Sequence, residues 1–197
     1  MPEAEDSPRY EFPDPPPPLA PVESVRCFDM RGARVIIGAA DQGWRGDLRA
    51  DDPLMREGTL MVPVLSESDF YRSEDEGCEA MAALHPAESV WVEKPDEESD
   101  RKTAPRHLFE RLVDVDSPPV RYPVPASEVP GLTGRRVWHW RDGEFTYDLR
   151  CVSEAYENPD GDIAVKLVPE RDWYRWARTG RPPVVDEALI HLVWVEG

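Results

Sequence analysis

The tetrapeptide VWVE at residues 193–196 also stands at residues 90–93, and the tripeptide DLR at 148–150 also stands at 47–49. The two pairs are separated by 103 and 101 residues. Further matches keep this order and spacing: Gly32, Arg34 and Val35 with Gly134, Arg136 and Val137, and Phe70-Tyr71-Arg72 with Trp173-Tyr174-Arg175. Several matches in one order at a nearly constant offset indicate one structural unit used twice.

The second copy shows the pattern of that unit more clearly. Alternating apolar and polar residues at 135–141 and 144–155 flank the turn sequence Asp142-Gly143, which is typical of a β-hairpin. A third strand is expected at 162–169, a short helix at 170–178 and a last strand at 188–196. In the first copy we expect a strand at 34–38, a strand at 59–65, and a helix that begins at a serine cap, Ser66 or Ser68, and runs to Ala83.

The predicted fold is therefore of the α+β class and mainly β. We expect a tandem duplication of a small β-β-β-α-β sheet or half-barrel, with the two copies packed together, because a small sheet needs a cover on one face. The predicted boundaries are a disordered, acidic and proline-rich tail at 1–20, unit one at 21–93, a linker with a short amphipathic helix at 94–122, and unit two at 123–197.

The charge of the chain bears on its partners. Forty acidic residues stand against 23 basic ones, which gives a formal net charge of −17. From Tyr122 onward there are nine basic and thirteen acidic residues, so most of the net charge lies in the first part of the chain. This balance disfavours direct binding to nucleic acid and favours another protein with a basic surface as the partner.

Compartment signals in the sequence are few. No stretch approaches the roughly 18 apolar residues of a membrane helix, so no membrane partner is expected. The acidic, proline-rich beginning of the chain does not resemble a secretory signal. Cys27, Cys78 and Cys151 are too few and too scattered for a disulfide framework, and a cytoplasmic location is expected.

Residues that both copies keep are expected to form the scaffold. This repeat signature comprises Asp47, Arg49, Asp69, Tyr71 and Trp91 in unit one and Asp148, Arg150, Asp172, Tyr174 and Trp194 in unit two. We expect the Asp-x-Arg pairs to fix a strand against the start of the helix, where Asp69 and Asp172 cap backbone N–H groups. An arginine fork for a carboxylate or phosphate ligand is the alternative.

Residues that only unit two carries mark a candidate binding surface. Unit two has Trp138, Trp140 and Trp176 where unit one has smaller residues. With basic neighbours, such rings form stacking and cation–π surfaces. The candidate binding residues are Trp138, His139, Trp140, Arg141, Arg150, Arg175 and Trp176. The alternative interpretation is that the large rings fill a small core.

The sequence favours binding over catalysis. It contains no glycine-rich phosphate loop, no hydrolase elbow and no zinc-protease motif, so we expect no catalytic residues, no metal site and no cofactor. The leading hypothesis is a non-enzymatic interaction module, of the inhibitor, immunity or mimic type. Two alternatives stay open: a small-molecule-binding protein or enzyme with a site between the copies, and a structural subunit of a larger assembly.

Overall fold

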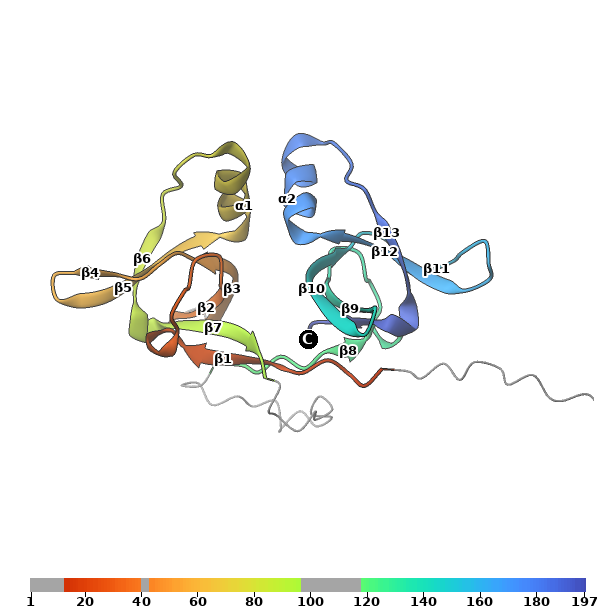
Figure 1. The fold of residues 1–197 in the computed structure, drawn as a ribbon, viewed down its shortest axis with the longest axis horizontal. Coiled ribbons are helices and arrows are strands. Elements are labelled where there is room, and N and C mark those ends of the chain that lie inside the picture. The colour runs from red at the N-terminus through yellow and green to blue at the C-terminus, as the bar shows by residue number, and fades with distance from the viewer. Residues whose placement is uncertain (1–12, 40–42, 97–117) are drawn as a thin grey trace, which may run out of the picture.

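A computed structural model describes residues 13–39, 43–96 and 118–197 of the chain. Over these ranges the protein consists of two similar units that lie side by side, each an antiparallel sheet with one helix (Figure 1). The predicted fold class, a mainly β tandem duplication, is confirmed. Most of the predicted tail and the amphipathic helix of the linker lie outside the described residues.

Unit one is a sheet of seven strands in the order β1-β7-β2-β3-β5-β4, with β6 paired to β5. Its elements are β1 (Leu19–Glu23), β2 (Arg34–Ala39), β3 (Gly43–Ala50), β4 (Leu54–Arg56), β5 (Thr59–Ser66), α1 (Glu67–Glu76), β6 (Ala83–Pro86) and β7 (Val90–Pro95). Short 3-10 turns at Ser24–Arg26 and Ala87–Ser89 follow β1 and β6. β1 begins at Leu19, inside the range predicted as tail.

Unit two follows the same path. Its sheet has the order β11-β12-β10-β9-β14-β8, with β13 paired to β12. Its elements are β8 (Val124–Pro125), β9 (Arg136–Arg141), β10 (Glu144–Cys151), β11 (Tyr156–Glu157), β12 (Ile163–Pro169), α2 (Glu170–Thr179), β13 (Asp186–Leu189) and β14 (Val193–Val195). The helix follows the same strand in both units, so the duplication extends to topology.

Each unit has its own apolar core, built from strand residues that alternate inward. In unit one, Val62, Val64, Val90 and Val92 are buried in one cluster with other apolar side chains. In unit two, the repeat-related valines of β14 are buried in the equivalent cluster. The VWVE repeat therefore supplies both cores through its two valines, as the period of two in a strand requires.

The helix predicted to reach Ala83 is shorter than expected. α1 ends at Glu76 because Gly77 adopts a left-handed conformation with φ +61° and closes the helix. Ala83–Pro86 is instead a strand that pairs with β5. In unit two, the single strand predicted at 188–196 is likewise split into β13 and β14 by a 3-10 turn at Ile190–Leu192.

The Asp-x-Arg motif lies on a bulge in each unit. Asp47 has φ +58° and Asp148 has φ +61°, and the pairing register shifts at these points of β3 and β10. Aspartate tolerates the left-handed region better than most residues. The bulge interrupts the simple alternation predicted for residues 144–155.

Charged residues of the repeat join the two units. Glu67 and Glu170, the first residues of α1 and α2, are about 1% exposed. Arg136 of unit two binds Glu67 of unit one and also Glu170, with an Nε–Oε1 distance of 2.6 Å. Arg49 of unit one lies 2.8 Å from Glu170, and Arg150 lies 2.7 Å from the same carboxylate. The buried glutamates are therefore shared between the units.

A second layer of ion pairs surrounds these two carboxylates. Arg34 of unit one binds Glu196 of unit two through both terminal nitrogens, at 2.9 and 2.5 Å. The bulge aspartates cross the interface as well: Asp148 lies 3.0 Å from Arg49, and Asp47 lies 3.0 Å from Arg136. The Asp-x-Arg residues thus pair across the interface between the units.

Backbone and ring contacts also join equivalent residues of the two units. Leu19 and Arg121, which occupy equivalent positions at an offset of 102 residues, exchange two backbone hydrogen bonds at 2.9 and 3.0 Å. Tyr71 and Tyr174 stack with ring centroids 5.6 Å apart. Equivalent residues that meet each other mark a pseudo-two-fold axis between the units.

Replacing Glu170 with alanine is expected to destabilise the protein by about 3–5 kcal/mol, because it leaves buried arginines without their carboxylate. Urea unfolding measures this change. The exposed Glu144 on β10 provides the control, since Glu144→Ala is expected to change the free energy of unfolding by about 0.5 kcal/mol or less. Equal losses in both variants would contradict the structural role of the interface.

Candidate functional site

The structure scatters the candidate binding residues of unit two over several places. Trp138 is 1% exposed and packs with Leu19 and Trp194. Its ring lies 5.1 Å from the ring of Tyr147. Trp138 is therefore part of the core and does not belong to an exposed binding surface.

The other candidate residues on β9 do not converge on a site either. Trp140 is half-buried against Phe145, with ring centroids 4.8 Å apart. Burial, with a smaller effect from Arg141, lowers the pKa of the half-buried His139. Arg141 is mainly exposed.

The candidate residues outside β9 lie elsewhere. Trp176 is 38% exposed on α2, Arg175 is bound to carboxylates, and Arg150 is in the interface network. The helix caps also differ from the expectation for Asp69 and Asp172. Ser66 accepts the backbone N–H of Asp69, and the cap of α2 has no side-chain hydrogen bond.

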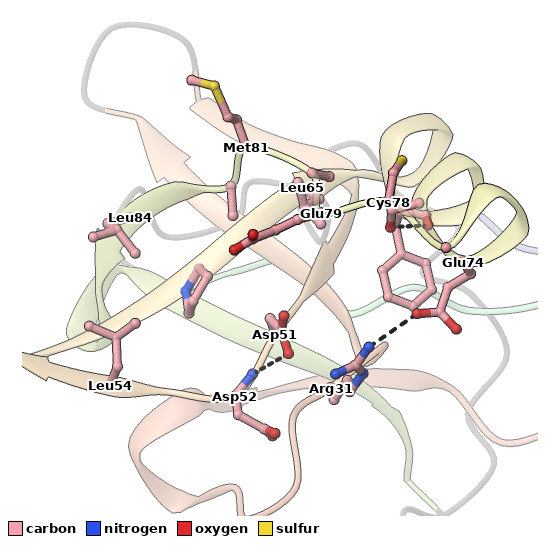
Figure 2. Close-up of a pocket in the computed structure, with 16 residues that line it drawn as sticks. Arg31, Asp51, Asp52, Leu54, Leu65, Glu74, Cys78, Glu79, Met81 and Leu84 are labelled. Carbon is pink, nitrogen blue, oxygen red and sulfur yellow. Dashed lines mark hydrogen bonds and ion pairs between the residues drawn. The ribbon is translucent and has the colours of Figure 1, made fainter.

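Unit one contains a groove that these sequence arguments missed. It lies between α1, the loop that follows α1, and the outer face of strands β4, β5 and β6 (Figure 2). Its volume is about 930 Å³. Apolar side chains line the floor: Leu54, Pro63, Leu65 and Leu84. Met81 in the loop is 99% exposed at the edge of the groove.

The alternation of β5 explains how one strand serves both the core and the groove. Val62 and Val64 are buried in the core of unit one, whereas Pro63 and Leu65 line the groove. Both faces of this strand are therefore apolar. Phe70 of α1 forms part of the wall, and a Cβ at Gly32 would lie only 3.2 Å from its ring. The missing side chain at Gly32, which has φ +76°, lets α1 sit this close to the sheet.

Carboxylates surround the apolar floor. Asp51 and Asp52 lie on the sheet side, and Glu74 and Glu79 lie on the helix side and in the loop. Among the described residues that line the groove, Arg31 is the one basic side chain. The groove therefore combines an apolar floor with a negatively charged rim.

Unit two has a different surface at the equivalent positions. Strand pairing aligns three floor residues of unit one with three polar residues: Leu54 with Tyr156, Pro63 with Lys166, and Leu84 with Glu187. These polar residues satisfy one another. The Tyr156 hydroxyl donates to Glu187, and the Lys166 ammonium lies 5.3 Å from the centroid of the tyrosine ring. The floor of unit one is therefore apolar at positions where unit two has polar side chains that contact one another.

The helix that forms the wall of the groove also differs between the two units. Ser73 and Glu74 of α1 correspond to Trp176 and Ala177 of α2 at the constant offset of 103 residues. The smaller Ser73 leaves space beside the floor, and Glu74 adds charge to the rim. The bulky residues found in unit two alone do not mark this groove. The sequence signal that does is the set of apolar residues that unit one has on an outward face.

Three arginines of α2 hold the helix that forms this wall. Arg171, Arg175 and Arg178 lie 2.8, 2.6 and 3.1 Å from the carboxylate of Asp75 on α1. The Asp75 side chain is 7% exposed. The counterpart of Asp75 in unit two is Arg178, so the contact joins an acidic helix to a basic one. The wall is therefore fixed by charge differences between the copies.

Shallower clefts lie on either side of the interface between the units. The larger, about 540 Å³, includes Arg34, Arg49 and Asp148 in its lining. The smaller, about 330 Å³, includes Arg136 and Arg150, and His139 is not among its lining residues. The interface arginines of both clefts are already bound to carboxylates.

In the part of the chain that the structure describes, no group of three or more His, Cys, Asp or Glu side chains could hold a metal ion. No helix within those ranges has both the length and the apolar character needed to cross a membrane.

Comparisons of the chain with models of protein families, with curated proteins and with solved structures each found no match.

The ion pairs of Asp75 predict a change of stability with pH. Hydrogen bonds from Arg175, Arg171 and Arg178 hold the pKa of Asp75 well below its ordinary value of 3.8, although burial acts in the opposite direction. Because the pKa is lower in the folded protein, the stabilisation is present above the ordinary value and is lost as the pH falls through the folded-state pKa.

Thermal melting from about pH 5 down to about pH 2 checks this expectation. The melting temperature of Asp75→Asn is expected to lie below that of the wild-type protein at the upper end of this range. The difference is expected to shrink as the pH falls. A difference that stays constant over the range would contradict the assigned ion pairs.

Proposed function

We propose that the protein is a non-enzymatic interaction module whose groove in unit one binds a segment of another protein. The segment carries apolar side chains for the floor and basic side chains for the rim. The observation that carries this proposal is the apolar floor inside a carboxylate rim. At the equivalent positions, unit two has polar side chains that bond to one another.

The exposed apolar residues around the groove support a binding role. Leu54 on β4 is 41% exposed and Met81 is 99% exposed, and both line the groove. Apolar side chains gathered beside a concave surface mark interaction sites more often than single exposed residues do. Methionine adapts to partners of different shape because its side chain is unbranched and polarizable. A bound segment would remove this surface from water.

The charge of the rim supports a basic partner. The rim carboxylates lie on a chain whose formal net charge is −17. An extended negative potential raises the rate of encounter with positively charged proteins and disfavours acidic ones. An inhibitor or immunity-type role, in which the groove covers a basic surface of a target, fits this chemistry. The alternative of a site between the units has less support, because the interface arginines there are already paired.

The double variant Asp51→Lys/Asp52→Lys is expected to weaken partner binding about tenfold or more, since it reverses two rim charges of modest individual energy. Peptides selected from a random displayed library on the immobilised wild-type protein serve as the probe. Fluorescence polarisation measures their affinity for each variant at low and at physiological salt.

Asp160→Lys/Asp162→Lys provides the matched control, because it makes the same change of charge at exposed positions of unit two. A basic and apolar consensus among selected peptides, with weaker binding only in the groove variant, supports the proposal. Failure to select any peptide, or equal losses in both variants, would remove it.

A further inference from the structure

One ion pair lies across the edge of the groove. An Nη2 atom of Arg31, in the loop before β2, lies 3.2 Å from Oε1 of Glu74 on α1. Both side chains are substantially exposed, at 62% and 42%. The hydrogen bond to Glu74 raises the pKa of Arg31, and the charge of Asp51 adds to this effect. The guanidinium thus occupies the position that a bound cation would take.

Figure 2 shows Arg31 between Glu74 on one side and Asp51 and Asp52 on the other. The same arginine also lines the neighbouring cleft between the units, together with Asp148. Arg31 therefore lies at the boundary of two cavities.

Unit two lacks both members of this pair. Thr133 stands at the position equivalent to Arg31, and Ala177 stands at the position of Glu74. The Thr133 hydroxyl instead donates to Glu154 at 2.8 Å. The ion pair therefore occurs only in the unit that has the apolar groove, and it is not needed for the fold that the two units share.

We propose that Arg31 is an internal competitor for the groove, and that an arginine or lysine of the partner segment replaces it on Glu74. This inference rests on the proposed function of the groove. The partner segment then has a defined chemistry: an apolar side chain for the floor, next to a basic side chain that exchanges with Arg31.

The energetics of an exposed ion pair make such an exchange feasible. Pairs of this kind contribute little to stability, because water and salt screen them, so the partner's cation has little to displace. A neutral segment gains nothing from Glu74, because Arg31 already neutralises it. The competitor therefore weakens the binding of basic segments and leaves the binding of neutral segments unchanged.

The dipeptides acetyl-leucyl-arginine amide and acetyl-leucyl-glutamine amide are suitable probes, because they differ only in the charged side chain. NMR titration of the full-length protein measures their affinities through shifts of groove residues such as Leu84 and Ala82. Arg31→Gln is expected to bind the arginine dipeptide about two- to fivefold more tightly than the wild-type protein. Its affinity for the glutamine dipeptide is expected to stay the same.

Two variants make the test specific. Arg72→Gln removes another exposed arginine, paired with Asp69 on α1, that does not line the groove; it is expected to leave both affinities unchanged. In a Glu74→Gln background, Arg31→Gln is expected to have no further effect, because the exchange site is gone.

The possible outcomes separate the two proposals. If neither dipeptide shifts the groove residues of the wild-type protein or of Arg31→Gln, the groove is not a binding site and both proposals fail. If the arginine dipeptide binds in the groove and Arg31→Gln leaves its affinity equal or lower, the internal competitor is wrong while the groove remains. An equal gain in Arg72→Gln would also overturn the competitor, since net charge alone would then explain the effect.

Discussion

The architecture depends on two carboxylates buried where the units meet. Glu67 and Glu170 lie close together out of contact with water, and charge of one sign cannot be buried there without compensation. Burial and the neighbouring carboxylate raise the pKa of Glu67. Burial also disfavours the charged form of Glu170, but Arg136 and Arg150 outweigh this effect and lower its pKa. Arg49 of unit one and Arg136 of unit two also bind the glutamate of the other unit, so compensating the two carboxylates takes arginines from both units.

This requirement separates residues that must stay alike from residues that are free to change. The positions that supply the network around Glu67 and Glu170 recur in both units, because each serves the same pseudo-two-fold arrangement. Positions outside this network have diverged. On the outer face of the sheet, unit two has a tyrosine, a lysine and a glutamate that bond with one another, and unit one has leucine, proline and leucine around an open groove. The shared network joins the two units, and the unshared residues on the outer faces distinguish their surfaces.

Much of the architecture could be predicted from the sequence. The VWVE and DLR matches predict the duplication, and the alternation around Asp142-Gly143 predicts the β9–β10 hairpin, which the strand pairing shows. The end of α1 was missed because a glycine that closes a helix resembles one that merely weakens it. The bulge at Asp148 was missed because a left-handed backbone conformation leaves the apolar pattern almost unchanged. The groove is formed by a loop, a helix and three strands, so its residues are close only in space. Spacing along the chain could not bring Leu54 and Leu84 together.

The opposite charges of α1 and α2 have a consequence for the number of units. Asp75 faces three arginines, and its counterpart in the other helix is itself an arginine. Two identical copies of either helix would bring like charges face to face. A chain shortened to one unit would lose this contact even if two copies paired through the residues that the units share. The divergence therefore favours the pairing of two unlike helices within one chain over the pairing of identical copies.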